Sequence, residues 1–314
     1  MINLVATTDN PVPEGARSFF LQARDGRHVR VAVFPCAGRA RGTVALFQGH
    51  NEFIEKYFET IEDLRRRGFD VATLDWRGQG ASERELEDPR KGHVDDFADY
   101  QLDLEVFLAE VMTERPQPWF ALAHSMGAAI MLDMANAARP PFQRMALVAP
   151  MIDLANLHFP SGARWLAETL DMMGLGGMYI PLGRGVSILE RPFEQNRLTT
   201  DPVRFARNAA IVTQTPELII GDPTIGWVNA AFRLMGRFVA PEYPRRIRTP
   251  ILTFTCGREE IVSNNAIERF VSNLNNASLI TVQGAKHELL MERDLLREQF
   301  WRAFDAFIPG EMQA

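Results

Sequence analysis

The segment 119–127, WFALAHSMG, contains the residue whose position is best suited to chemistry. A short apolar strand is predicted to end just before Ser125, and a helix that opens with small residues is predicted to begin just after it. A serine on such a tight strand-to-helix turn has an exposed hydroxyl, and small residues two positions to each side let the strand and the helix approach closely. Ala123 and Gly127 occupy those two positions. We therefore predict that Ser125 is a nucleophile and not merely the cap of an ordinary helix.

A nucleophilic serine needs a general base, and two histidines remain downstream of Ser125. His158 lies in a stretch that has no strand pattern. His287 instead follows the last predicted strand, on a loop just before the final helix. That loop is expected at the same edge of the sheet as the serine, so we predict that His287 is the base.

The acid that orients the base is expected at the end of the preceding strand, 250–256, because the chain order is serine, acid, histidine. Two neighbouring glutamates and no aspartate follow that strand. Glu259 comes first, and apolar residues then turn back to pack, so we favour Glu259. Glu260 would then be a surface charge or a partner of Arg258. The carboxylate would hold the imidazole tautomer and stabilise the imidazolium.

Two backbone amides are predicted to form an oxyanion hole. The helix after Ser125 offers the amide of Met126 and the positive end of its dipole. The loop after the strand 43–48 offers the second amide, that of His50, because Gly49 permits an unusual backbone there. The chain contains neither an H-E-x-x-H motif, nor paired Cys/His spacing, nor a G-x-G-x-x-G after a strand, so we expect no metal and no cofactor.

These residues need a sheet that brings them together. An antiparallel hairpin over 18–34 is followed by short apolar strands that alternate with helical segments, which predicts an α/β fold with a mostly parallel, doubly wound sheet. Strands are predicted at 43–48, 70–75, 119–124, 145–149, 250–256 and 278–282, and helices at 57–67, from Asp95 or Asp96 to Val111, and at 126–138, 264–274 and 292–308.

The alternation stops between residues 151 and 243, where the chain is helical and rich in loops. We predict a core domain of residues 1–150 and 244–314, with 151–243 inserted as a helical cap over the edge where open α/β sheets bind ligands. His124, Trp227 and Met173 are the candidates for the lining of a substrate pocket. The cap's many large apolar side chains fit two interpretations, an acyl-chain tunnel with a lip that touches a membrane, or simply the cap's own core.

Bulk composition excludes several classes of protein. The 314 residues have the apolar and charged content of a soluble globular chain, and a net charge of −6 without a basic run argues against nucleic-acid binding. The arginine clusters at 65–67 and 245–248 are interpreted as solvated surface. Neither a signal-peptide pattern nor an apolar run of about 18 residues occurs. Because Cys36 and Cys256 lie far apart, a cytoplasmic chain with two free thiols is the simpler interpretation.

Six segments spread over nearly the whole chain carry a resemblance to a known family. They are Gln48–Glu52, Asp75–Ser82, Gly92–Phe97, His124–Gly127, Gly221–Trp227 and Gly284–Glu288. In combination they resemble the monoacylglycerol lipase and bacterial lysophospholipase branch of the α/β-hydrolases, serine hydrolases that cleave esters of single-chain glycerolipids. The resemblance implies an acyl-enzyme on Ser125. Two positions depart from the family pattern, since Gln48 replaces a more common histidine and Glu259 a more usual aspartate.

Three other functions share parts of this pattern. A small-ester carboxylesterase would share every catalytic residue. A proline-type aminopeptidase would need acids in the cap to bind the substrate amine, for which the candidates are Glu168, Asp171, Glu190 and Glu194. A non-catalytic binding protein on the same scaffold is least favoured, because the serine, glutamate and histidine are all present. The expected partners are a small lipid ester and, through the cap, a membrane surface touched transiently from the cytoplasm.

Overall fold

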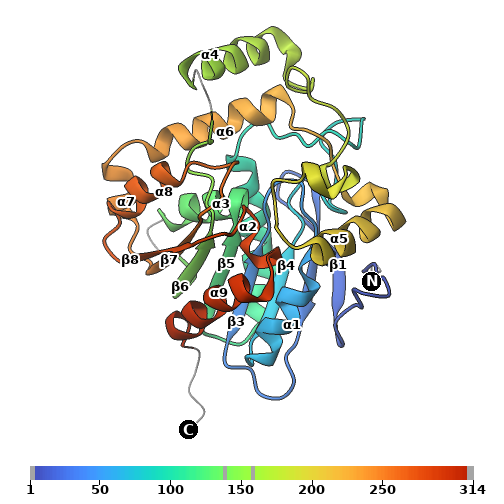
Figure 1. Cartoon of the computed structure of the whole chain (residues 1–314), viewed down its shortest axis with the longest axis vertical. Coiled ribbons are helices and arrows are strands. Elements are labelled where there is room, and N and C mark those ends of the chain that lie inside the picture. The colour runs from blue at the N-terminus through green and yellow to red at the C-terminus, as the bar shows by residue number, and fades with distance from the viewer. Residues whose placement is uncertain (1–3, 137–139, 157–159, 310–314) are drawn as a thin grey trace.

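The computed structural model describes residues 4–136, 140–156 and 160–309, and its centre is one eight-stranded sheet (Figure 1). The strands are β1 (Arg17–Gln22), β2 (His28–Phe34), β3 (Thr43–Phe47), β4 (Asp70–Leu74), β5 (Trp119–His124), β6 (Arg144–Val148), β7 (Ile251–Cys256) and β8 (Ala277–Val282). Their spatial order is β1-β2-β4-β3-β5-β6-β7-β8. The pairs β1–β2 and β2–β4 are antiparallel and all other neighbours are parallel. This confirms the predicted α/β fold.

The helices agree with the predicted ranges to within a few residues at most ends. Outside the segment 151–243 they are η1 (Ile54–Tyr57), α1 (Phe58–Arg66), α2 (Ala98–Glu110), η2 (Met112–Glu114), α3 (Ser125–Ala135), α8 (Asn264–Val271), η7 (Leu289–Met291) and α9 (Asp294–Phe307). Helix α2 starts at Ala98 with Phe97 as its N-cap, so neither predicted aspartate caps it, although Asp96 Oδ1 accepts a hydrogen bond from Ala98 N at 2.9 Å. The final helix starts at Asp294, two residues later than predicted, and a separate 3₁₀ turn over Leu289–Met291 precedes it.

Strands β3 to β7 are buried along almost their whole length, which explains their nearly continuous apolar sequences. A parallel sheet is covered by helices on both faces, so its strands show no alternation of apolar and polar residues. The main hydrophobic core is built from these strands and from the inner faces of the helices beside them. Strand β8 lies at the sheet edge and is only partly buried.

The segment 151–243 contributes no strand to the sheet among its described residues. Its elements are α4 (Pro160–Leu170), the π-helical turn η3 (Asp171–Leu175), η4 (Ile188–Glu190), η5 (Phe193–Gln195), α5 (Pro202–Gln214), η6 (Pro216–Leu218), α6 (Ile225–Phe238) and α7 (Glu242–Arg246). Figure 1 shows α6 between the sheet and α4, which lies at the top of the molecule. Helix α4 packs against α6 and η3 and buries only Ala167.

The structure tests the predicted exposure of the two arginine clusters and the predicted free state of the two cysteines. Arg245, Arg246 and Arg248 are exposed, as predicted. In the other arginine cluster the prediction holds for Arg66, whose side chain is 72% exposed. It was wrong for Arg67, which packs over the Trp301 ring at 4.0 Å, and for Arg65, which donates to the backbone oxygen of Pro35 at 2.8 Å. Both cysteines are buried and free. No helix in the described ranges has the length and apolarity that crossing a bilayer requires.

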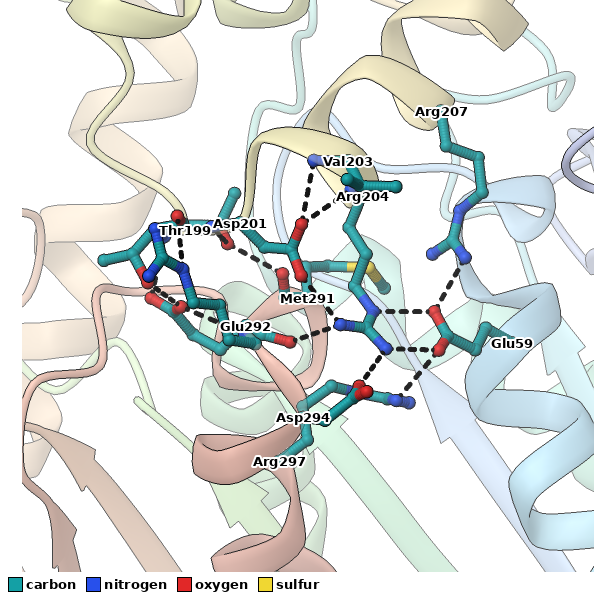
Figure 2. A network of polar contacts seen from close by, with 12 residues as sticks. Glu59, Thr199, Asp201, Val203, Arg204, Arg207, Met291, Glu292, Asp294 and Arg297 are labelled. Carbon is teal, nitrogen blue, oxygen red and sulfur yellow. Dashed lines mark hydrogen bonds and ion pairs between the residues drawn. The ribbon is translucent and has the colours of Figure 1, made fainter.

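Helix α5 is tied to the rest of the fold by a network of charges (Figure 2). Arg204 donates two hydrogen bonds to Glu59 of α1, at 2.8 and 2.6 Å, and one to Asp294 of α9 at 2.6 Å. Arg207 and Arg297 also donate to Glu59, at 2.7 and 2.9 Å. One carboxylate of α1 is therefore shared by three guanidinium groups from α5 and α9.

We predict that Glu59→Gln destabilises the fold and makes it less sensitive to acid. Partial burial alone would raise the pKa of Glu59, but the hydrogen bond from Arg204 and the charges of Arg297 and Arg207 lower it from 4.5 to about 2. The carboxylate therefore stabilises the fold fully above its ordinary pKa, and this contribution is lost as the pH falls through about 2. Denaturant unfolding at about pH 7 should show a loss of about 2 kcal/mol.

Glu298→Gln provides the control, because Glu298 forms an exposed i,i+4 pair with Arg302. Its loss should change the free energy of unfolding by less than about 0.5 kcal/mol. The Glu59 variant should also show a shallower fall of stability than the wild type below about pH 4.5. Equal effects of the two substitutions, or parallel acid profiles, would contradict the proposed anchoring by Glu59.

Candidate active site

Ser125 lies on a strained turn between β5 and α3. Its φ is +50°, a value that non-glycine residues rarely adopt. A Cβ added to Gly127 would lie 2.4 Å from the carbonyl oxygen of Gln48, so α3 can approach β3 this closely only with glycine there. Ala123 on the other side is fully buried, so its methyl group fits where a glycine is more usual. The sequence-level account of the turn therefore agrees with its geometry.

The structure brings the three predicted side chains into one row. His287 Nε2 lies 3.0 Å from Ser125 Oγ, and His287 Nδ1 lies 2.8 Å from Glu259 Oε2. The other carboxylate oxygen of Glu259 accepts from the backbone amides of Ile261 and Val262, at 2.8 and 3.3 Å. These bonds fix the carboxylate opposite the imidazole. The side chains of His287 and Glu259 are 5% and 1% exposed, so water competes little for their contact.

Glu259 and Glu260 have clearly different surroundings. Burial alone would raise the pKa of Glu259, but His287 and the two amides lower it overall, so this carboxyl is ionised. Glu260 points away, with a side chain 49% exposed and 3.8 Å from Arg197. The geometry therefore favours Glu259 as the partner of the histidine. His158, the other downstream histidine, lies outside the described residues.

The two predicted oxyanion amides come from segments that meet at Ser125. A Cβ on Gly49 would lie 3.2 Å from the Cβ of Ser125, so this loop packs directly on the start of α3. Gly49 N donates to the Glu52 carboxylate, and this hydrogen bond spans the loop segment that contains His50. Among the described residues, the amide N–H groups of His50 and Met126 donate no hydrogen bond to the backbone of another segment.

A cavity of about 980 Å³ is lined by Ser125 and His287 together with apolar side chains of α4 and α6. His124 and Trp227, two of the predicted pocket residues, also line it. Trp227 is held by a hydrogen bond from its Nε1 to the hydroxyl of Tyr100 in α2, at 3.1 Å. The apolar lining from the two helices comprises Ala163, Leu166, Ala167, Leu170, Ile225, Val228 and Phe232.

Met173 does not belong to this lining, so its predicted placement was wrong. Its side chain is 69% exposed. It lies in the π-helical turn η3, which buries none of its residues. The sequence shows Met173 only as one of many large apolar residues between 151 and 243, and Gly174 directly after it has a non-helical φ of +80°.

His50 adds a neutral imidazole to the cavity wall. Burial lowers the pKa of His50 to about 4. The ring packs against Trp227 with a centroid distance of 4.2 Å, and its Nε2 is buried with no hydrogen-bond partner among the described residues. The ring of His50 therefore faces Trp227, while its amide stays the predicted second oxyanion donor.

A buried ionic cluster beside the site was not predicted. Lys56 Nζ lies 2.7 Å from Glu52 and 2.5 Å from Glu288, and all three side chains are almost fully buried. His124 contacts the same Glu52 at 3.1 Å. The four-residue spacing of Glu52 and Lys56, and the position of Glu288 directly after His287, were the only sequence signals of this cluster.

The segment 196–199 of the inserted region holds the loop that follows His287. The Glu288 amide donates to Leu198 O at 2.8 Å, and the Thr199 hydroxyl donates to Met291 O at 2.7 Å. Lys286 Nζ donates to Asn196 O at 2.8 Å. The position of the histidine therefore depends on contacts with the segment inserted after β6 as well as on the sheet.

This arrangement is suited to acyl transfer. A neutral imidazole in contact with a serine hydroxyl can accept its proton, and the carboxylate on the other ring nitrogen stabilises the imidazolium that forms. Backbone amides at the start of α3 and on the neighbouring loop can stabilise the negative charge that develops on a carbonyl oxygen. No group of His, Cys, Asp or Glu side chains within residues 4–136, 140–156 and 160–309 is arranged to hold a metal ion.

Comparisons with known proteins agree with this chemistry. A family model described as Serine aminopeptidase, S33 (Hydrolase_4) matches residues 38–294. Lysophospholipase L2 of Escherichia coli (strain K12) is 32% identical over 291 residues, which cover 88% of this chain and 80% of that protein. Monoglyceride lipase of Rattus norvegicus is 32% identical over 183 residues, 57% of each protein.

Two solved structures share the fold at lower identity. One is a soluble variant of monoglyceride lipase from Saccharomyces cerevisiae in complex with a substrate analog, with a TM-score of 0.74, 18% identity, and 93% of this chain and 95% of that chain covered. The other is a highly thermostable carboxyl esterase from Bacillus coagulans in complex with glycerol, with a TM-score of 0.74, 17% identity, and 94% and 98% covered.

We predict that Glu259→Gln lowers kcat for p-nitrophenyl butyrate by roughly a thousandfold or more, because a glutamine amide cannot stabilise the protonated His287. Glu260→Gln is the matched control and should leave kcat within about twofold of the wild type, since its carboxylate is exposed. Steady-state kinetics on folded variants measures both. A severe defect in the Glu260 variant together with a mild one in the Glu259 variant would reverse the assignment.

Proposed function

The chain belongs to the Hydrolase_4 (serine aminopeptidase, S33) family of α/β-hydrolases, and we propose that it cleaves carboxylic esters of single-chain lipids, lysophospholipids or monoacylglycerols, through an acyl-enzyme on Ser125. The observation that carries the proposal is the row of Glu259, His287 and Ser125 at the wall of a large apolar cavity. The names of the relatives, lysophospholipase L2 and monoglyceride lipase, support the same class of substrate.

In the proposed mechanism, His287 Nε2 takes the proton of Ser125 while Oγ attacks the ester carbonyl. The amides of His50 and Met126 stabilise the oxyanion of the tetrahedral intermediate. His287 then gives its proton to the departing alcohol oxygen, which leaves the acyl group on Ser125. A water molecule, deprotonated by the same histidine, attacks the acyl-enzyme and releases the fatty acid.

The cavity supports a long acyl chain better than a small ester. Its volume of about 980 Å³ is at the upper end of the usual range for ligand pockets, about 300 to 1,000 Å³. Most of its wall is apolar, with side chains of α4 and α6 among the contributors, so burial of each methylene would contribute about 0.8 kcal/mol. We propose that residues 151–243 act as a cap that encloses this chain.

The cap's exposed apolar side chains, some of which also line the cavity, support contact with a lipid surface. Most of the exposed large apolar side chains of the described residues lie between residues 165 and 186. They are Trp165, Leu166, Met172, Met173, Met178, Leu182 and Val186. Apolar surface gathered on one short segment is typical of a binding surface, and methionines adapt to irregular partners.

An aminopeptidase is less well supported. None of the cap acids proposed to bind a substrate amine, Glu168, Asp171, Glu190 and Glu194, lines the cavity. Glu190 accepts instead from the Ser187 amide and from Arg90, and Asp171 accepts from Asn229. Of the acids that do line the cavity, Glu52 and Glu288 contact Lys56, and Asp222 accepts from the Arg184 amide and lies 3.5 Å from Arg191. A cationic substrate amine would therefore find no free carboxylate among the lining acids.

We predict that a fluorophosphonate probe labels the wild type and not Ser125→Ala, because only an activated serine reacts. A substrate panel then separates the candidates. Monoacylglycerol and lysophosphatidylcholine should be hydrolysed, p-nitrophenyl esters should be cleaved faster as the acyl chain lengthens, and aminoacyl amides should stay intact. Absence of labelling would refute the enzyme assignment. Turnover of amides alone would refute the lipid ester assignment, and a preference for the shortest esters would favour the carboxylesterase.

We also predict that the double variant Met172→Ser, Met173→Ser hydrolyses monoacylglycerol in vesicles several-fold more slowly than the wild type. Both side chains are mostly exposed, so the substitution should spare the fold and weaken lipid contact. Hydrolysis of a water-soluble ester should be unchanged. Leu295→Ser, an equally exposed apolar position on α9, is the control and should affect neither assay. Equal loss on both substrates would argue against a membrane role.

A further inference from the structure

His124 faces a hydrogen-bond acceptor at both ring nitrogens. Its Nδ1 lies 3.1 Å from Glu52 Oε2, and its Nε2 lies 3.2 Å from the backbone oxygen of His287. A carbonyl oxygen can only accept, and a neutral imidazole carries a single N–H. A neutral His124 would therefore leave one of these two buried contacts without a proton. Both are hydrogen bonds only if both nitrogens are protonated.

Glu52 cannot supply the missing proton. Its carboxyl group already accepts from Lys56 Nζ at 2.7 Å, from the Tyr57 hydroxyl at 2.8 Å and from the amide of Gly49. A group with three donors directed at it is an ionised carboxylate. Burial alone would raise the pKa of Glu52, but Lys56 and His124 hold it well below its ordinary value.

The charge balance of the buried cluster leads to the same conclusion independently. The charged groups facing His124 are Glu52, Glu288 and Lys56, and none is more than 6% exposed. The titratable ring of His287 also packs against His124, with a centroid distance of 4.8 Å. Two carboxylates and one ammonium leave a net charge of −1, which is unfavourable away from water. A proton on His124 brings the cluster to zero. Burial alone would lower the pKa of His124, yet the Glu52 and Glu288 charges raise it overall.

We propose that His124 is an imidazolium throughout the working pH range and is a positioning residue for the active site. Its Nε2–H holds the backbone of His287, the base in the proposed function on which this inference rests. Its Nδ1–H holds Glu52, which in turn bonds the amide of Gly49 just before the oxyanion residue His50. Hydrogen bonds of a charged donor are stronger than neutral ones, so one cation sets the distance between the base and the oxyanion hole.

The charge can be measured directly by NMR on the full chain with ¹⁵N-labelled histidine. One imidazole, identified by its disappearance in His124→Gln, should show both nitrogens protonated and unchanged from about pH 6 to about pH 9. Glu52→Gln should return that ring to ordinary titration. A neutral tautomer, or titration in the wild type near the usual histidine pKa, would overturn the proposal. If a variant does not fold, selective assignment by contact with His287 keeps the wild-type measurement decisive.

Kinetics tests the positioning role. A glutamine at position 124 has no charge and cannot donate to both partners, so His124→Gln should lower kcat by about tenfold to a hundredfold while KM changes little. Fluorophosphonate labelling should slow by a similar factor. An unchanged kcat, or a defect confined to KM, would overturn positioning. If the wild type hydrolyses no ester but His124 is doubly protonated, the proposed function fails while the assignment of the charge stands.

Discussion

The functional site depends on how closely α3 approaches β3. Because Gly127 lacks a side chain, the start of the helix lies against the carbonyl of Gln48, and the chain must turn at Ser125 with a positive φ. The turn places the serine hydroxyl at the carboxyl edge of a parallel sheet. The turn after β7 and the loop after β8 end at the same edge, so they can bring Glu259 and His287 to it without any special distortion.

Buried charges then hold the loops of that edge in place. Glu52 and Lys56 join the loop of Gly49 and His50 to Glu288, which follows His287, and His124 joins both to the turn at Ser125. Buried ion pairs contribute little to net stability because of their desolvation, but removing one partner is strongly destabilising. Their effect is therefore to specify one geometry, and this is what a hydrogen-bonded row of three side chains requires.

The segment 151–243 is anchored unequally. Two arginines of α5 and one of α9 donate hydrogen bonds to Glu59 of α1. The residues just before α5 form hydrogen bonds with the loop after His287. Helix α4 buries only Ala167 and presents large apolar side chains to solvent. One end of the segment thus holds the loop after His287, while the other supplies cavity wall and exposed apolar surface, the two features on which the proposed lipid substrate rests.

Much of this was predictable from local patterns. The sequence alone determined the alternating strands and helices, the turn at Ser125 and the choice of His287, because strand burial, small residues at a tight turn and loop position all leave periodic or positional marks. Only the tertiary structure placed Glu259 rather than Glu260 against His287, left Met173 out of the cavity lining and assembled the cluster around His124. Those features depend on the direction of single side chains and on partners up to hundreds of residues apart, which no local pattern records.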